Sequence, residues 1–183
     1  APLYSPTDGS PQYKNSVYDG LQAYLQSDIP ADKIVLGMPF YGYLYQDVNS
    51  RNMGLYSSFS AARSVSYHTL KNNYLNQSDY IHLRHSTAGV PYLYGNNTFI
   101  SYEDEQSLAA KVNLAQSLDL AGIGIWELSH DTSGTLFQSI LTALDDGWAN
   151  PFVDVARDSW YYDSIRFVQQ HGMMTGTSAI TFA

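Results

Sequence analysis

The fold is decided by the stretch Ala121-Gly122-Ile123-Gly124-Ile125-Trp126-Glu127-Leu128-Ser129-His130-Asp131. Its first half is small and apolar, which is typical of a strand packed on both faces, and its second half is abruptly polar. An α/β barrel presents side chains at its catalytic rim in this way, on a buried parallel strand that ends in polar residues. The stretch therefore predicts a barrel strand with a functional carboxyl end.

A second buried strand is predicted over Lys33–Gly42, which is a continuous apolar run. Period-two alternation divides its residues between two faces, a small-residue face that would line a barrel interior and a bulky face that would meet helices. The small face would carry Val35, Gly37, Pro39 and Tyr41, and the bulky face Ile34, Leu36, Met38 and Phe40.

Three amphipathic helices are expected beside these strands. Ser16 can cap the first, and the acidic residues 103–105 open the second, where negative charge complements the N-terminal helix dipole. The order helix, strand, insert, helix, strand and helix predicts an α/β fold made of βα units. The apolar stripes are Val17, Leu21, Tyr24 and Leu25; Leu108, Val112, Ala115 and Leu118; and Leu136, Ile140, Leu141 and Leu144.

Residues 44–98 break this pattern, because they form short Tyr- and Asn-rich pieces without a sustained period. They predict an inserted small α+β subdomain between the two barrel strands. We expect a helix at about 67–74 and short strands near 80–83 and 91–94.

A second boundary falls at residues 147–151, where Gly, Trp, Ala, Asn and Pro follow one another. The chain is therefore predicted to consist of a first domain over residues 1–146 and a short helical tail module over residues 151–183. The helix of the tail should run through Ile165 and Val168.

Composition excludes several classes of function. The formal net charge is −8 and the nine basic residues form no cluster, so nucleic acid is not expected as a partner. The chain has no Cys, which removes thiolate catalysis and thiolate metal sites, and it has no apolar run long enough for a membrane span. Its 16 Tyr suit sugar stacking as well as ordinary half-buried packing, and packing is the more common use.

Two parallel strands cannot close a barrel or form a stable sheet by themselves. The opening Ala1-Pro2-Leu3-Tyr4 also reads like the middle of a domain, so we expect a fragment of a longer protein. If the chain is autonomous, the barrel-facing sides of both strands must be covered by another copy, which predicts self-association.

Two stretches together resemble the family-18 glycoside hydrolases, which comprise the chitinases and their cell-wall and spore-associated relatives. Residues 29–42 are similar to the seventh barrel strand, with its Tyr-Gly signature. Residues 102–131, with Lys111, are similar to the seventh helix and the eighth strand. The insert at 44–98 lies where many members carry an α+β domain that walls the substrate groove. The resemblance thus implies the C-terminal βα units of a (β/α)8 TIM barrel.

The implied activity is cleavage of β-1,4 bonds in N-acetylglucosamine polymers with retention. In this family one Glu protonates the leaving oxygen and the substrate's own acetamido oxygen attacks the anomeric carbon. The acids lie in an Asp-x-x-Asp-x-Asp-x-Glu motif that this sequence does not contain. We therefore assign no catalytic residue, and neither a cofactor nor a metal is expected.

The resemblance instead implies a sugar-binding floor in this chain. Trp126 matches the eighth-strand Trp that stacks under the sugar at the cleaved position, and Tyr41 matches a seventh-strand Tyr of the same subsite. Tyr43 stands where the family usually has Arg, which favours a peptidoglycan- or spore-type relative or a different sugar substitution. The expected substrate-binding residues are Trp126, Tyr41, Tyr43 and Glu127; the alternative for Trp126 is an ordinary core residue.

Other polar residues invite simpler interpretations. Glu127 and Asp131 could be read as a catalytic carboxylate pair, but rim positions or partners of a backbone turn fit them better. His82 and His85 lie in the irregular insert, and a metal site there would require further ligands that the sequence does not supply.

The tail resembles part of an S-layer homology module, with Phe152, Trp160 and Gly172 at the expected places. In such modules the Trp and the Gly turns pack a small helical unit, and arrays of them bind secondary cell-wall polymer. A short helical tail without this role is the alternative.

These observations predict the C-terminal part of a secreted, wall- or surface-held bacterial glycoside hydrolase that acts on chitin or peptidoglycan-type glycans. Two alternatives stay open. One is a catalytically inactive, chitinase-like carbohydrate-binding surface protein, and the other is a wall-attachment protein in which the barrel is only a spacer.

Overall fold

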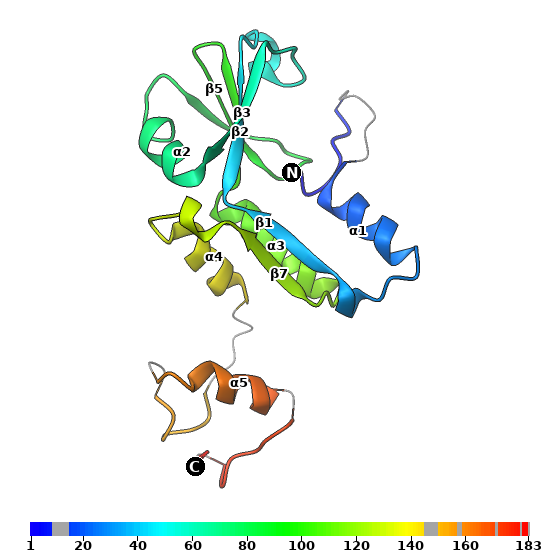
Figure 1. Ribbon diagram of the computed structural model, residues 1–183, viewed down its shortest axis with the longest axis vertical. Coiled ribbons are helices and arrows are strands. Elements are labelled where there is room, and N and C mark those ends of the chain that lie inside the picture. The colour runs from blue at the N-terminus through cyan, green and yellow to red at the C-terminus, as the bar shows by residue number, and fades with distance from the viewer. Residues whose placement is uncertain (9–14, 145–149, 157–158, 171, 180, 183) are drawn as a thin grey trace. The chain divides into compact units, whose positions relative to one another are not determined.

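The computed structural model describes residues 1–8, 15–144, 150–156, 159–170, 172–179 and 181–182. The chain forms two compact units, Ala1–Leu144 and Asp145–Ala183, and each is described by itself. The first unit contains two separate sheets, a parallel pair and a larger antiparallel sheet (Figure 1). The α/β class expected from the order of elements is confirmed.

The parallel pair consists of β1 (Val35–Pro39) and β7 (Gly122–Trp126), paired from Val35 with Gly122 to Pro39 with Trp126. The single strand expected over Lys33–Gly42 is wrong in extent, because the chain changes sheets at Phe40. The Phe40 N–H donates to the Trp126 carbonyl (2.9 Å), and its own carbonyl accepts from the Tyr67 N–H (2.9 Å). Phe40 is fully buried and joins the two sheets.

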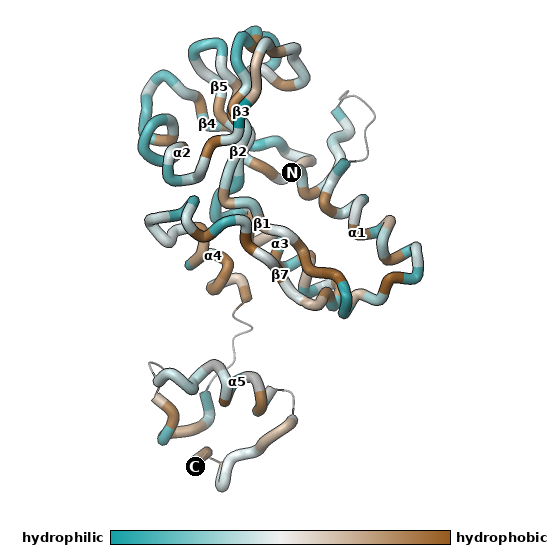
Figure 2. The backbone as a smooth tube through the Cα atoms, viewed as in Figure 1, coloured by the Kyte–Doolittle hydropathy of each residue, from teal (hydrophilic) through white to brown (hydrophobic). Residues whose placement is uncertain are grey.

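One face of this pair is covered by α3 (Glu105–Ser117) and α4 (Thr135–Leu144). The predicted bulky face is confirmed, since Leu36, Met38 and Phe40 pack against both helices. Because these helices cover a single face, β7 is only half-buried and the expectation of burial on both faces is wrong. Figure 2 shows hydrophobic residues along β1, β7 and α4, whereas α2 is largely hydrophilic.

The antiparallel sheet, called the insertion sheet below, has the strand order β3-β2-β6-β5-β4. Its first residue is Tyr41 and its last is Ser101, so it extends beyond both ends of the insert expected at 44–98. The expected helix and both expected short strands are present. The elements are β2 (Tyr41–Gln46), β3 (Ala61–Ser66), α2 (Tyr67–Asn73), β4 (Ile81–Arg84), β5 (Pro91–Gly95) and β6 (Thr98–Ser101).

One face of the insertion sheet packs under α2, around the fully buried Leu70, Leu93 and Ile100. Gly42 is required here, because a Cβ at this position would lie 2.4 Å from the Ser101 carbonyl oxygen. The short 3-10 turns of the first unit are Ala31–Lys33, Arg51–Gly54 and Leu128–His130.

Helix α1 (Val17–Leu25) begins where expected, and the Ser16 side chain accepts from the Asp19 N–H (3.0 Å). Only Leu21 of the predicted stripe is buried, whereas Tyr24 is exposed. The helix therefore rests on the rest of the unit by a narrow contact.

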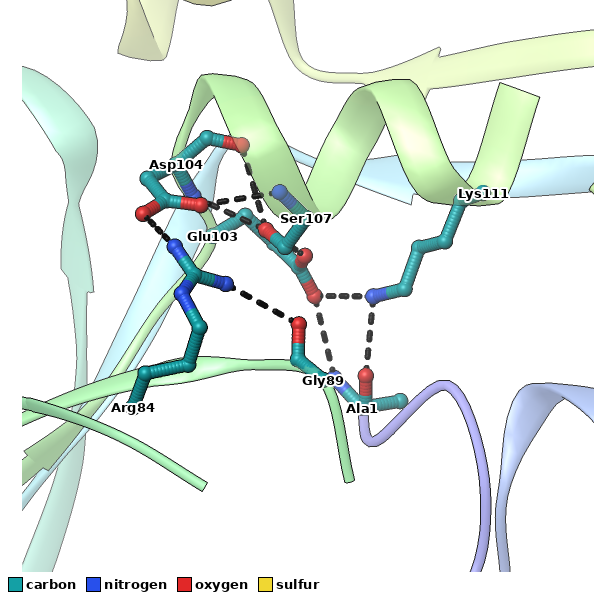
Figure 3. Close-up of polar contacts among 7 residues, drawn as sticks. All are labelled: Ala1, Arg84, Gly89, Glu103, Asp104, Ser107 and Lys111. Carbon is teal, nitrogen blue, oxygen red and sulfur yellow. Dashed lines mark hydrogen bonds and ion pairs between the residues drawn. The ribbon is translucent and has the colours of Figure 1, made fainter. Parts of the chain in front are cut away.

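The start of α3 holds a buried ion pair (Figure 3). Asp104 caps the helix in a capping box with Ser107, as the acidic run led us to expect. Glu103, by contrast, is not a solvated dipole partner, because it is buried and pairs with Lys111, while the Ser107 hydroxyl donates to its Oε2 (2.7 Å). Lys111 also donates to the Ala1 carbonyl (2.8 Å), so the pair ties residue 1 to α3.

The second unit contains α5 (Tyr162–Gln170) and a small core of Phe152, Val155 and Ile165. Gly176 packs closely, since a Cβ there would lie 2.6 Å from the Phe152 ring. The expectation that Trp160 packs the module is wrong, because its side chain is 91% exposed and stacks edge-on against Tyr161.

Among the described residues of both units, no helix has the length and apolar character needed to cross a membrane.

Candidate functional site

The carboxyl ends of β1 and β7 meet at one edge of the parallel pair, where β2 begins. Parallel strands end at the same edge, so Pro39 and Trp126 are register partners there and Tyr41 follows two residues later. A hollow of about 230 Å³ opens at this junction. This Trp126 hollow is lined by Tyr41, Tyr43, Ser64, Ser66, Trp126 and His130.

Trp126 projects from an anchored backbone. Its carbonyl accepts from the Phe40 N–H (2.9 Å), while its side chain is 70% exposed. A core tryptophan would lose its ring surface to neighbours, and among the described residues the Trp126 ring does not. The ring offers a broad apolar face to whatever enters the hollow.

Tyr41 and Tyr43 form the aromatic wall of the hollow. They alternate along β2 and so share a face, with ring centroids 5.9 Å apart. Their register partners on β3 are Ser66 and Ser64, which place two hydroxyl groups beside the rings. The wall therefore combines flat apolar surfaces with hydrogen-bonding groups.

Glu127, the fourth predicted site residue, does not line the hollow. Its carboxylate accepts from the Ser129 hydroxyl (2.5 Å) and lies 3.3 Å from the His130 Nε2. It thus holds the short turn Leu128–His130 rather than facing the cavity. The structure brings together Trp126, Tyr41 and Tyr43, and leaves Glu127 outside the lining of the hollow, beside His130.

His130 was not predicted as a site residue. Its ring meets the Tyr41 ring edge-on at a centroid distance of 6.2 Å, and its buried Nδ1 has no partner within the described part of the chain. Its position three residues after Glu127, in a turn, is the only sequence signal, and nothing in the sequence indicates contact with Tyr41. Ser64 and Ser66 were missed for the same reason, since their place depends on strand register.

Asp131 has a structural role. Its Oδ2 accepts from the backbone N–H groups of Leu136 (2.7 Å) and Phe137 (3.1 Å), at the start of α4. The expectation that it partners a backbone turn is confirmed. With Oδ2 engaged in this way, Asp131 does not form a catalytic pair with Glu127.

The histidines of the insert do not assemble into a metal site. His85 is buried, and its Nε2 lies 2.7 Å from the Tyr56 hydroxyl and 3.0 Å from Asp8 Oδ2. His82 lies on β4 and is exposed. Among the residues that the structure describes, no cluster of three His, Asp or Glu side chains could hold a metal ion.

Two buried tyrosines, Tyr67 and Tyr102, belong to the hydrophobic cores beneath the two sheets. Burial, assisted by the Asp104 carboxylate, raises the pKa of the Tyr102 hydroxyl to about 12. Burial also raises the pKa of Tyr67 well above its ordinary value. Neither tyrosine lines the hollow, so these shifts concern stability rather than chemistry at the site.

Several characterised proteins are similar to this chain in sequence and in structure. Chitinase A1 from Niallia circulans is 35% identical over 154 residues, which cover 79% of this chain and 22% of that protein. The solved family-18 N-acetylglucosaminidase from Paenibacillus barengoltzii matches with a TM-score of 0.74 and 29% identity, over 79% of this chain and 42% of that one.

The chitinase ChiW from Paenibacillus sp. FPU-7, described as a cell-surface-expressed multi-modular enzyme, matches with a TM-score of 0.71 and 32% identity. That match covers 82% of this chain and 18% of ChiW. The chain therefore spans less than half the length of each of these three relatives.

The family model for glycosyl hydrolases of family 18 matches residues 1–131, which include both strands of the parallel pair, the whole insertion sheet and all six residues of the Trp126 hollow. This chain belongs to glycosyl hydrolase family 18.

Proposed function

We propose that this chain supplies the sugar-binding floor and one groove wall of a glycoside hydrolase that cleaves β-1,4-linked N-acetylglucosamine-containing glycans. The observation that carries the proposal is the exposed Trp126 ring at the carboxyl end of β7, faced by Tyr41 and Tyr43. A pyranose has a flat C–H face that packs on an aromatic ring while its hydroxyls reach polar neighbours. The names of the relatives, chitinases and an N-acetylglucosaminidase, support this class of sugar.

Each lining residue has a distinct part in the proposed site. Trp126 forms the floor beneath the sugar ring, and Tyr41 and Tyr43 form the side wall. The Ser64 and Ser66 hydroxyls can donate to or accept from sugar oxygens. Glu127 acts indirectly, by holding the turn that carries His130 against Tyr41.

The bond cleavage itself is proposed to be substrate-assisted and retaining. The general acid would be a glutamate of an Asp-x-x-Asp-x-Asp-x-Glu motif, and the 183 residues contain no such motif. The residues of this chain would therefore bind and orient the sugar, and a partner segment would supply the acid. The same observation favours a second candidate, a carbohydrate-binding protein without hydrolytic activity.

Calorimetric titration with chito-oligosaccharides tests the binding proposal. Trp126→Ala should weaken binding by about tenfold or more, because a stacked aromatic contact and its buried surface are lost. Trp160→Ala is the matched control, since this exposed tryptophan lies in the second unit, and it should leave affinity unchanged. Equal affinities for both variants and the unmodified chain would refute the proposal.

The presence or absence of the catalytic motif in a longer protein that contains this chain distinguishes the two candidates. If it contains the catalytic glutamate, the longer protein should release reducing ends from chitin or peptidoglycan, and the Glu→Gln variant should not. If the glutamate is absent and no hydrolysis is detected while binding persists, the carbohydrate-binding candidate holds.

We also propose that residues 151–183 are part of an S-layer homology module that holds an extracellular enzyme at the bacterial wall. The sequence pattern supports this, as does the description of ChiW as cell-surface-expressed. Exposed apolar side chains of this segment, including Val153 and Met173, offer a surface for such attachment. Pull-down with purified cell walls should capture the chain only when residues 151–183 are present, and equal capture of both forms would contradict the idea.

Self-association of the chain is a further proposal. The face of the parallel pair opposite α3 and α4 carries Val35, which is 58% exposed. Burying this apolar surface against a second copy of the chain would remove it from water. Light scattering over a concentration series should detect a dimer that Val35→Glu dissociates. A compact monomer at every concentration would count against it.

A further inference from the structure

His85, which directly follows β4, is a buried histidine that does not line the Trp126 hollow. Segments far apart in the sequence meet at its ring. They are the N-terminal residues 1–8, the loop after the 3-10 turn Arg51–Gly54, and the turn that joins β4 to β5. The ring is therefore placed where it can hold these segments together.

Both ring nitrogens of His85 have partners. Nδ1 accepts from the Ala88 N–H (3.1 Å), and Nε2 lies 2.7 Å from the Tyr56 hydroxyl and 3.0 Å from Asp8 Oδ2. Because an N–H points at Nδ1, the neutral ring carries its proton on Nε2 and can donate it to Asp8. The Tyr56 hydroxyl donates to the other carboxylate oxygen, Asp8 Oδ1 (2.8 Å). We call His85, Ala88, Asp8 and Tyr56 the His85 clasp.

The ring of His85 closes the turn between β4 and β5 from the inside. The His85 N–H donates to the Val90 carbonyl (3.0 Å), and the Gly89 N–H donates to the His85 carbonyl (3.0 Å). Gly89 has φ +69°, in the left-handed region that favours glycine. The bond from the Ala88 N–H to the ring adds a side-chain acceptor to this turn.

The same turn holds the N-terminal segment. The Leu3 N–H donates to the Ala88 carbonyl (2.7 Å), and both residues are buried. Leu3 shares a hydrophobic core with Leu21 of α1 and Leu114 of α3. The Tyr18 N–H of α1 donates to the Leu3 carbonyl (3.1 Å). The His85 clasp thus connects the insertion sheet to the core beneath α1.

A second proton on the ring is incompatible with this arrangement. Imidazole is the side chain whose charge ordinarily changes between about pH 5 and 8. The added proton would go to Nδ1 of His85, so that two donors, Nδ1–H and the Ala88 N–H, would face each other. The bond between them is buried, and a buried donor without an acceptor is unfavourable. Opening the turn would relieve this conflict, because water would then reach both groups.

The ionisable groups nearest the ring do not relieve it. The Asp8 carboxylate faces Nε2, which carries a proton in both charge states of His85, and at 43% exposure its charge is screened by water. The hydrogen bond from Tyr56 lowers the pKa of Asp8. Burial, assisted by the Asp8 charge, raises the pKa of the Tyr92 hydroxyl on β5. Asp8 therefore stays charged and Tyr92 stays neutral while an imidazole titrates.

The cation next to His85 in the sequence is already engaged. Arg84 pairs with Asp104 and donates to the Gly89 carbonyl (3.0 Å), as Figure 3 shows. Its guanidinium keeps its charge at every pH considered, so these contacts persist when the imidazole becomes charged. The Arg84 contacts therefore support the turn without responding to acid.

We propose that the His85 clasp is a pH-sensitive joint, which the neutral imidazole closes and the imidazolium opens, releasing residues 1–8 from the insertion sheet. The clasp is complete above the range in which the imidazole titrates and is lost as the pH falls through it. The hydrogen bonds of Phe40 to Trp126 and Tyr67 involve only backbone groups, so this second attachment of the sheet does not titrate. Acid therefore opens the joint locally, without global unfolding.

Hydrogen exchange of single amides, followed by NMR on the full chain between about pH 7.5 and pH 5, tests this proposal. Rates are expressed as protection factors, which remove the intrinsic effect of pH on exchange. Protection of the Ala88 and Leu3 amides should fall by about tenfold or more as the pH is lowered, whereas the Phe40 amide should keep its protection. The nitrogen chemical shifts of the His85 ring report its charge in the same samples.

Two substitutions assign the effect to His85. His85→Asn places an amide oxygen near the position of Nδ1, so the Ala88 N–H keeps an acceptor that does not titrate. Protection at Ala88 and Leu3 should then be independent of pH. His82→Asn is the matched control, because His82 lies on the adjoining strand β4 and is exposed, and it should leave the fall in protection unchanged.

The outcomes that overturn the proposal are distinct. Protection at Ala88 and Leu3 that does not fall by about pH 5 overturns it, whether or not the ring has become charged. A fall that persists in His85→Asn would assign the effect to another group and would also overturn it. If His85→Asn does not fold, the unmodified chain decides. Its ring must then become charged in the same pH range in which protection is lost, and separate ranges refute the joint.

Discussion

The two sheets of the first unit each have one face packed under helices, but the exposed residues of their opposite faces differ in chemistry. The parallel pair exposes small and aliphatic residues such as Val35 and Gly37, whereas the insertion sheet exposes tyrosines and serines. Burial lowers the free energy of an aliphatic surface by removing it from water, so this face favours contact with another protein surface. Tyr and Ser stay solvated and can still hold a sugar. The comparison separates a surface for assembly from a surface for binding.

The largest expected effect concerns the ion pair where α3 leaves the insertion sheet toward the parallel pair. Lys111→Ala removes the buried ammonium group that pairs with Glu103, which keeps the Ser107 hydroxyl and the terminal ammonium of Ala1 as partners, and we expect the free energy of unfolding to fall by about 3–5 kcal/mol. Urea denaturation measures this. Lys33→Ala, which alters an exposed pair with Asp32, is the control and should change stability by less than about 0.5 kcal/mol.

A double substitution sharpens the interpretation. Glu103→Gln combined with Lys111→Met removes both charges, so it should recover much of the stability lost in Lys111→Ala. If Lys111→Ala costs less than about 1 kcal/mol, the pair does not link the two sheets energetically.

Two glycines test the difference between covered and bare faces directly. Gly42→Ala places a methyl group against the Ser101 carbonyl and the Tyr102 side chain, and should cost about 1–3 kcal/mol. Gly37→Ala, on the bare face of β1, meets nothing within 4 Å and should be neutral or stabilise by about 0.5–1 kcal/mol. Thermal unfolding measures the stability of both variants. Equal losses of stability would mean that the face at Gly37 is covered.

Each sheet also packs on a buried tyrosine whose pKa is raised. Tyr67 belongs to the core beneath the parallel pair, and Tyr102 belongs to the core beneath the insertion sheet. The pKa of Tyr102 is about 12 in the folded state and about 10 in the unfolded state, so the unfolded chain loses its proton first. Its contribution is complete below pH 10 and is lost as the pH rises toward 12.

Tyr102→Phe should therefore flatten the fall of stability between pH 10 and 12 by about 1–2 kcal/mol. Tyr67→Phe should act in the same direction, because burial raises the pKa of Tyr67 as well. Urea titrations at several alkaline pH values measure the slope. An unchanged slope in both variants would indicate that other groups govern alkaline unfolding.

The sequence predicted the helices and the two parallel strands, but not strands β3 and β6 of the insertion sheet, nor how the two sheets are joined. Period-two alternation predicted the buried residues Leu36, Met38 and Phe40, and small polar caps predicted the start of α1. The switch of sheets at Phe40 could not be predicted, because it depends on hydrogen bonds to Trp126 and Tyr67, far away in the chain.

The site follows the same division. Three of its aromatic residues were found because their motifs resemble a known family, and the structure gathers them at one hollow. His130, Ser64 and Ser66 reach that hollow only through register and a turn, which leave no pattern in the sequence. Glu127 was chosen for its place beside Trp126, yet the turn directs its carboxylate to Ser129 and His130 instead.

The smallest expected effect on stability is at Trp126 itself, at the carboxyl end of β7. Because the ring is 70% exposed, Trp126→Ala should change the free energy of unfolding by less than about 0.5 kcal/mol. Val35→Ala, at the other end of the parallel register, is a matched exposed site and should behave alike in a monomeric sample. Urea denaturation at low protein concentration measures both. A loss of 2 kcal/mol or more at Trp126 alone would mean that its ring is packed in solution, and the proposed floor would then be part of a protein interface.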